Sequence, residues 1–148
     1  MRALKTLSIG LLFLLFSNCG STKSINPLNL LTGNSWALSS LMGNGLDMNQ
    51  FVGGIPSLSF LDGGKLAGFS GCNNFSGNFS LEGTGLQLDP GAITKKMCPG
   101  SGEQVFMATL NKVGELKVGK DKLTLLDGAT ELMSFVPKKD YVLVIVIL

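Results

Sequence analysis

Few residue types in this chain could do chemistry, because it contains no histidine. Histidine-based nucleophilic catalysis, histidine-ligated zinc and a charge switch near neutral pH are therefore excluded. A zinc site made only of thiolates needs four cysteines, and the chain has three, Cys19, Cys72 and Cys98. A hydrolase that pairs a hydroxyl with Lys95 or Lys96 stays possible. Both lysines fall in predicted turns or beside a helix, where water keeps an amine charged and a poor base, so we expect no enzyme.

Residues 1–18 have the layout of a bacterial export signal that ends at a cysteine. The apolar run, residues 7–16, follows two cations and is shorter than the roughly 20 residues needed to cross a membrane. Residues 16–20 resemble the lipobox of bacterial lipoproteins, which implies cleavage before Cys19 and attachment of lipid to its thiol. The alternative is ordinary cleavage that leaves a free thiol. We expect a lipid-anchored envelope protein, at the outer membrane and facing the periplasm.

Processing at Cys19 has two consequences for the rest of the chain. Cys72 and Cys98 remain as an even pair in an oxidising compartment, which favours a disulfide, with two buried free thiols as the alternative. Removal of Arg2 and Lys5 from 12 basic residues leaves a formal charge of zero against 10 acidic ones. A neutral domain has no basic excess to attract nucleic acid. We also expect no cofactor and no metal, because neither a calcium loop nor a phosphate-binding glycine loop is present.

The elements that position these residues are short strands separated by glycine turns. A hairpin is predicted over residues 57–69, where polar and apolar residues alternate on both sides of a glycine turn. Phe75, Phe79 and Leu81 mark a third strand by their even spacing, and residues 123–135 repeat the hairpin pattern. The sequence therefore predicts a mainly β (α+β) fold, a meandering antiparallel sheet with one helix packed against it.

The single helix is expected to begin at Ser101, in a capping box with Gln104, and to end at Gly114. Phe106 and Leu110 fall on one face of that helix, which we expect to cover one side of the sheet.

The remaining segments complete the predicted domain organisation. Residues 19–33 are rich in small polar residues and predict a lipidated cysteine with a short tether to a domain over residues 34–136. We expect residues 137–148 to form an apolar C-terminal strand or tail. We interpret the last eight residues as a closing strand buried on both faces, with a frayed, aggregation-prone tail as the alternative.

Two cysteine-containing segments carry a resemblance to a known family. They are residues 68–79, Gly-Phe-Ser-Gly-Cys-Asn-Asn-Phe-Ser-Gly-Asn-Phe, and residues 93–98, Ile-Thr-Lys-Lys-Met-Cys. Together with Trp-Ala-Leu at residues 36–38 they resemble the META domain family, which includes the heat-inducible HslJ-like lipoproteins. The resemblance covers residues 34–136 and implies a small antiparallel barrel-like fold with one helix. It also implies an envelope lipoprotein linked to heat stress and antibiotic tolerance, with no agreed enzymatic activity.

Several polar residues beside the two cysteines are the candidates for binding. A functional interpretation places them around one polar groove near the disulfide. A structural interpretation uses their side chains to satisfy backbone groups, and we favour it because such bonds are commoner than ligand contacts. The candidates are Asn73, Asn74, Thr94, Lys95 and Lys96.

The sequence thus predicts a non-catalytic binding or structural module, held on the membrane by lipid and acting on an envelope protein or a small ligand. The link to envelope or heat stress follows from the family resemblance. Two alternatives stay open: a lipoprotein inhibitor of a secreted hydrolase, which would present a rigid loop to an enzyme cleft, and a hydrolase built on serine and lysine.

Overall fold

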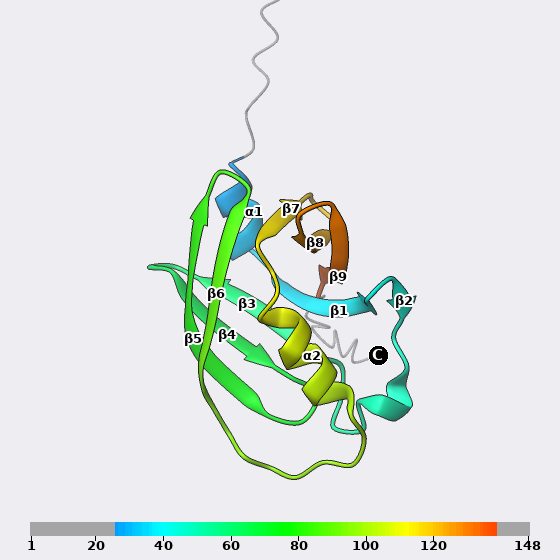
Figure 1. Ribbon diagram of the computed structural model, residues 1–148. Coiled ribbons are helices and arrows are strands. Elements are labelled where there is room, and N and C mark those ends of the chain that lie inside the picture. The colour runs from blue at the N-terminus through cyan, green and yellow to red at the C-terminus, as the bar shows by residue number, and fades with distance from the viewer. Residues whose placement is uncertain (1–25, 139–148) are drawn as a thin grey trace, which may run out of the picture.

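The computed structural model describes residues 26–138, so the predicted signal, Cys19 and the apolar residues 141–148 lie outside it. No helix between residues 26 and 138 is both long and apolar enough to cross a membrane. Figure 1 shows the elements in chain order. They are α1 (Pro27–Thr32), β1 (Ser35–Leu41), β2 (Asn44–Gly45), the 3-10 helix η1 (Met48–Gln50), β3 (Ser57–Leu61), β4 (Lys65–Phe69), β5 (Asn74–Glu82), β6 (Gly85–Ile93), α2 (Gly102–Leu110), β7 (Glu115–Val118), β8 (Leu123–Asp127) and β9 (Thr130–Pro137).

The strands form one antiparallel sheet that closes on itself. Their order is β2-β1-β3-β4-β5-β6-β7-β8-β9, and β1 also pairs with β9. The ring is uneven, because β5 and β6 pair along most of their length whereas β6 and β7 share only the pair Gly85 and Glu115. The predicted mainly β, antiparallel barrel-like fold is therefore confirmed, as a ring-like closure rather than a regular barrel (Figure 1).

Both predicted hairpins are present. β3 and β4 pair from Ser57 with Phe69 to Leu61 with Lys65, and β8 and β9 turn between Asp127 and Thr130. The alternation that predicted them reflects burial, since one face of β3 is buried while the residues between are only partly covered.

Side chains fill the interior of the ring. The largest fully buried ones come from different elements, namely Trp36 of β1, Phe60 of β3, Phe106 of α2 and Phe135 of β9. They belong to one continuous apolar cluster. Burial of each such side chain contributes on the order of 2 kcal/mol, so the core rather than the surface holds the fold together. A filled interior leaves the outer surface and the loops for interactions.

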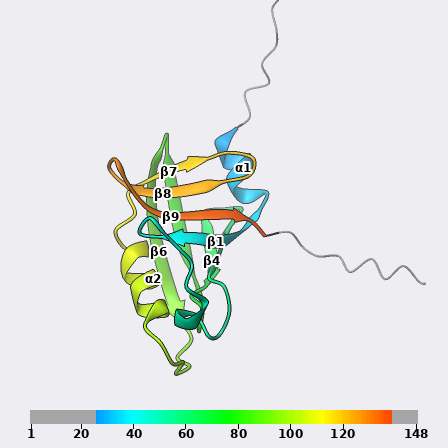
Figure 2. The ribbon, with the colours of Figure 1, turned by 90° about the vertical axis from the view of Figure 1, so that its right-hand side faces the viewer.

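The predicted helix is confirmed as α2, which lies beside β6 in both Figure 1 and Figure 2. Phe106 is fully buried, and its ring centroid lies 6.4 Å from that of Phe75 in β5. The helix therefore covers the side of the ring where β6 and β7 barely pair.

The predicted start of this helix is correct, since Ser101 is its N-cap residue, but the capping box and the predicted end are wrong. Ser101 precedes the first turn without a side-chain capping bond, and its hydroxyl instead donates to Gln50 Oε1 at 2.9 Å. The last helical residue is Leu110, four residues before the predicted Gly114, with Asn111 as the C-cap. The backbone N–H of Asn111 still reaches the helix carbonyls, so no glycine is needed at that point.

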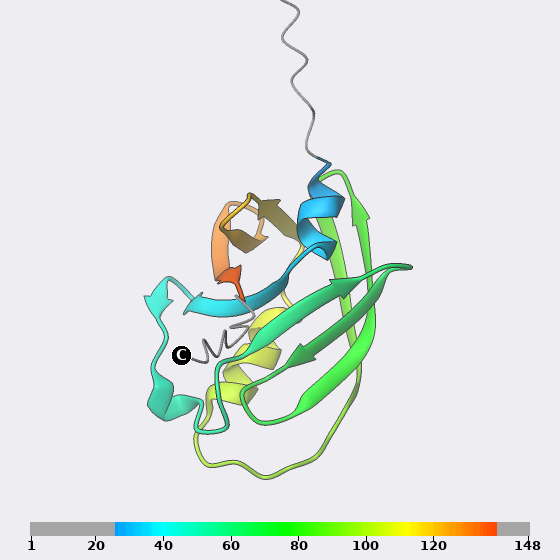
Figure 3. The same ribbon diagram turned by 180° about the vertical axis from the view of Figure 1, so that it is seen from behind.

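A second α-helix corrects the predicted tether over residues 19–33. The Asn26 side chain accepts from Leu28 N–H at 3.0 Å and caps α1. Leu31 is fully buried, and its carbonyl accepts from the indole N–H of Trp36 at 3.0 Å. Figure 3 shows α1 at the end of the molecule where the β5–β6 hairpin turns. Residues 27–32 thus belong to the folded domain, because Leu31 is part of its core.

Candidate functional site

A disulfide joins Cys72 to Cys98, with Cα atoms 5.9 Å apart. It links the turn between β4 and β5 to the loop that runs from β6 to α2. The turn depends on Gly71, whose φ of +94° is a left-handed conformation that favours glycine. A Cβ at Gly71 would also overlap the Phe51 ring, so only glycine fits at this position.

Asn73 is the centre of the polar contacts around this disulfide, and only 4% of it is exposed. Its Oδ1 accepts from the Thr94 hydroxyl at 2.9 Å and from the Lys96 backbone N–H at 2.6 Å. Its Nδ2 donates to the Lys96 carbonyl at 3.1 Å. One side-chain amide therefore holds both backbone groups of Lys96, as a neighbouring strand would.

Glu103 and Ser70 hold Asn73 in this position. The two Glu103 carboxylate oxygens accept from Asn73 Nδ2 at 2.9 and 3.1 Å. Glu103 lies in the first turn of α2, where the free N–H groups and the helix dipole favour a carboxylate. The fully buried Ser70 donates its hydroxyl to Glu103 at 2.5 Å and its backbone N–H to the Asn73 carbonyl at 2.8 Å. We call Ser70, Asn73 and Glu103 the Asn73 cluster.

The Asn73 cluster satisfies its own polar groups. Within residues 26–138, no buried side-chain nitrogen or oxygen lacks a hydrogen-bond partner. The buried members of this cluster, Ser70 and Asn73, rigidify the backbone that they contact, because losing a partner would leave buried polar atoms with fewer hydrogen bonds. The arrangement holds a loop in place, and it leaves no unpaired acid or base among its members.

The loop is also fastened on either side of this cluster. Thr94 exchanges hydrogen bonds with Asn74, its N–H donating to the Asn74 carbonyl at 3.0 Å and its hydroxyl accepting from the Asn74 N–H at 3.1 Å. At the far end, the Gln50 side chain accepts from both the N–H and the hydroxyl of Ser101.

The structure does not gather the predicted binding residues around one groove. Lys96 lines a polar hollow of about 220 Å³ beside the disulfide and Glu103. Asn74 and Thr94 line a different surface depression, of about 270 Å³, and Asn73 is buried. The predicted residues therefore do not line one shared groove, and the polar atoms of Asn73 and Thr94 are hydrogen-bonded to each other, to Glu103 and to backbone groups.

The lysine amines make no contact of the kind that a hydrolase needs. Lys95 and Lys96 are exposed, and within the described part of the chain neither amine donates a hydrogen bond or forms a salt bridge. A lysine that acts as a base must be desolvated beside a hydroxyl, and neither lysine is.

The domain order and these motifs agree with a comparison against known families. The model of the META domain family matches residues 29–140. This chain belongs to the META domain family. The match begins inside α1, so it supports counting this helix as part of the META domain. No curated protein matches the chain.

Three solved structures are similar in fold to this chain. A DUF4847 family protein from Bacteroides vulgatus is 14% identical, with a TM-score of 0.60 over 77% of this chain and 99% of that one. An NMR structure of a protein from Burkholderia xenovorans is 21% identical, with a TM-score of 0.57 over 77% of this chain and 89% of that one. A second NMR structure is 22% identical, with a TM-score of 0.57 over 76% and 95%. Identities this low show likeness of fold alone.

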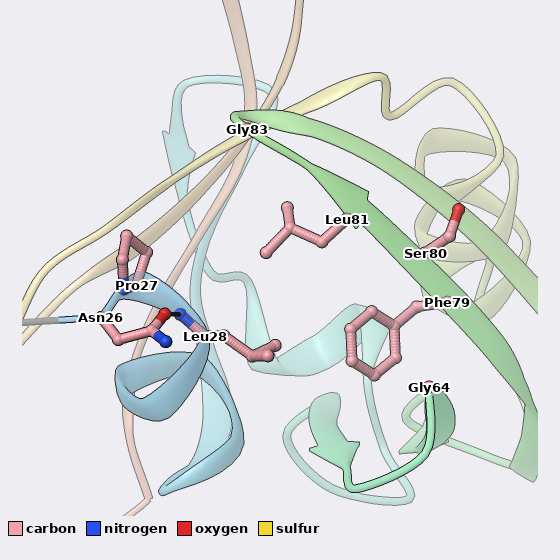
Figure 4. Close-up of a pocket in the computed structure, with 8 residues that line it drawn as sticks. All are labelled: Asn26, Pro27, Leu28, Gly64, Phe79, Ser80, Leu81 and Gly83. Carbon is pink, nitrogen blue, oxygen red and sulfur yellow. Dashed lines mark hydrogen bonds between the residues drawn. The ribbon is translucent and has the colours of Figure 1, made fainter.

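The META domain also carries an open apolar hollow of about 460 Å³ between α1 and the β5–β6 hairpin (Figure 4). Leu28, Phe79 and Leu81 line it, and the Asn26 side chain at its edge is used as the cap of α1. No set of convergent polar groups lies there, which is what a specific small-molecule site needs.

A second apolar hollow, of about 650 Å³, lies at the end of β9 and includes Ile55 and Val136.

Among residues 26–138, no group of three or more carboxylate, thiol or imidazole side chains is placed to hold a metal ion. The loop held by the Asn73 cluster is therefore the most specifically built surface of this META domain.

Proposed function

We propose that this META domain protein is a lipid-anchored lipoprotein of the cell envelope that works as a non-catalytic binding or structural module. The observation that carries the proposal is the Asn73 cluster, whose buried polar groups hold an exposed loop. A catalytic site needs a polar group that is free to contact a substrate, whereas the polar groups of this cluster are hydrogen-bonded to one another and to the loop backbone. The filled interior supports the same conclusion, because interactions then take place on the surface.

The anchor is Cys19, which would carry the lipid after cleavage of residues 1–18. Acyl chains stabilise membrane association by about 0.8 kcal/mol for each buried methylene, and two or three chains make the association durable. Cys19 lies seven residues before Asn26, the first described residue, a distance of at most about 25 Å in a fully extended chain. The domain would therefore work close to the membrane surface, at the outer membrane and facing the periplasm.

The family resemblance suggests that this module helps to maintain the envelope under heat or antibiotic stress. The hydrolase alternative built on Lys95 or Lys96 is disfavoured, because both amines are exposed and without a hydroxyl partner in the described residues. The inhibitor alternative is favoured by one specific observation, which is that the exposed loop is held rigidly.

Two experiments test the proposed function. Mass spectrometry of the mature protein should show an acylated Cys19 as its first residue, and Cys19→Ser should move the protein from the membrane to the soluble fraction. A strain that lacks the protein should show raised envelope permeability and lower survival after heating, restored by the wild type and only weakly by Cys19→Ser. An unmodified Cys19 would contradict the anchor, and unchanged permeability and heat survival would contradict the envelope role.

A further inference from the structure

We propose that residues 95–99 bind, like a substrate, in the active-site cleft of a secreted endopeptidase and inhibit it. Met97 enters an apolar primary pocket of that enzyme. This inference rests on the proposed non-catalytic binding function and names the class of partner.

The domain holds this segment at two points, Lys96 and Cys98. Asn73 holds both backbone groups of Lys96, and the disulfide holds Cys98. Met97 lies between these two fixed residues and is fully exposed. The backbone N–H and carbonyl groups of Lys95 and Met97 have no hydrogen-bond partner within residues 26–138. Held and free residues therefore alternate, which is the pattern of an extended chain with one side turned outward.

A segment with these properties matches a cleft that binds extended peptides. The unpaired backbone groups can pair with a partner's strand edge, while an outward side chain enters a pocket. Because the loop is already ordered by the Asn73 cluster, binding loses little conformational entropy. The methionine side chain is flexible and polarisable, so it adapts to an apolar pocket of imperfect fit.

The flanking charges indicate what surrounds that pocket. Lys95 and Lys96 are exposed, and neither takes part in a salt bridge within the described residues. Two unpaired cations beside the apolar Met97 favour a cleft with carboxylates on its rim, which also speeds the encounter of the two proteins.

The same contacts explain why this segment would inhibit rather than be consumed. Hydrolysis of the bond between Met97 and Cys98 adds water and leaves a carboxylate on Met97 and an amine on Cys98. The two new ends cannot separate, because Asn73 holds Lys96 on one side and the disulfide holds Cys98 on the other. The cleaved product stays in place, whereas an ordinary peptide substrate would diffuse away.

The test titrates the full-length lipidated protein, in detergent and with its disulfide intact, against two endopeptidases cleaving small peptide substrates. One is chymotrypsin-like, with an apolar primary pocket, and the other is trypsin-like, with a carboxylate in that pocket. We expect competitive inhibition of the chymotrypsin-like enzyme. Met97→Asp should weaken it by about 30-fold or more, as expected for removal of a central anchor. Met97→Lys should transfer inhibition to the trypsin-like enzyme.

The matched control is Met48→Asp, which changes another exposed methionine, in η1, and should inhibit like the wild type. Because the Met97 side chain is fully exposed, its variants should keep the wild-type unfolding midpoint, and this is checked in urea. Reduction of the disulfide should also weaken inhibition.

Three results would overturn the inference. The first is that the chymotrypsin-like enzyme is not inhibited at about 100 µM, a concentration well above the Kd of specific complexes. The second is that the wild type and Met97→Asp inhibit equally. The third is that the protein is cleaved rapidly and the enzyme loses no activity. The membrane release of Cys19→Ser and the phenotype of the deletion strain are measured independently. If those hold while inhibition fails, the endopeptidase partner is wrong and the proposed envelope function still stands.

Discussion

Replacement of Cys72 and Cys98 by serine, in a background that carries Cys19→Ser, removes all three cysteines of the chain. The disulfide that is lost spans a sequence separation of 26 residues. Closing a loop of this size lowers the conformational entropy of the unfolded chain. By the chain-entropy relation, this loss raises the free energy of unfolding by about 3.5 kcal/mol at 25 °C. We therefore expect the free energy of unfolding to fall by about 3.5 kcal/mol, a large part of the 5–15 kcal/mol typical of a domain.

The assay is urea unfolding followed by the fluorescence of Trp36, the only tryptophan, which is fully buried in the core. The Cys19→Ser protein with its disulfide intact is the reference, and the same protein under reductant is the control. Because removing the disulfide acts mainly on the entropy of the unfolded state, the fluorescence spectrum of the folded protein should not change.

The reduced reference and the double serine variant should unfold at the same urea concentration, below that of the oxidised reference. A loss smaller than about 1 kcal/mol would refute the reasoning, because the loop closure would then contribute far less than the chain-entropy relation requires. Identical unfolding with and without reductant would show that the thiols are not joined.

Two further substitutions test the packing of the fold, each by its urea midpoint against a matched control. Gly77→Ala should lower stability by about 3 kcal/mol, because its Cβ would overlap the Asp89 carbonyl of β6, whereas Gly45→Ala should stay within about 0.5 kcal/mol because nothing lies near it. Phe106→Ala should cost about 4 kcal/mol through the cavity it leaves in the core, whereas the same change at the exposed Val105 should cost less than about 0.5 kcal/mol. Equal losses in either pair would contradict the packing described here.

Local patterns made the hairpins and α2 predictable from the sequence. A glycine turn between two alternating segments predicts a hairpin without knowledge of the rest of the chain, and both such hairpins are present. The family resemblance added the closed sheet. That closure depends on β1 pairing with β9, for example Leu38 with Phe135, and no local pattern contains such a distant pair.

The structural features that the sequence did not predict depend on contacts between residues far apart in the chain or on very short sequence signals. Ser70 and Glu103 are 33 residues apart, so their hydrogen bond leaves no local pattern in the sequence. The Ser101 side chain makes no capping bond and instead donates its hydroxyl to Gln50, 51 residues away, a contact that no local pattern reveals. The helix α1 has six residues, and its signal is only an Asn cap followed by Pro27, in a stretch whose polar composition is typical of a tether.

Asn73 holds the exposed loop through both backbone groups of Lys96. Hydrogen exchange at the Lys96 amide tests it most directly, because that N–H lies in an exposed segment and bonds only to the Asn73 side chain. We expect slow exchange at Lys96 in the wild type. In Asn73→Ala the Lys96 amide should exchange rapidly, while the strand amide of Leu125 stays protected. Rapid exchange of the Lys96 amide in the oxidised wild-type protein would contradict the claim.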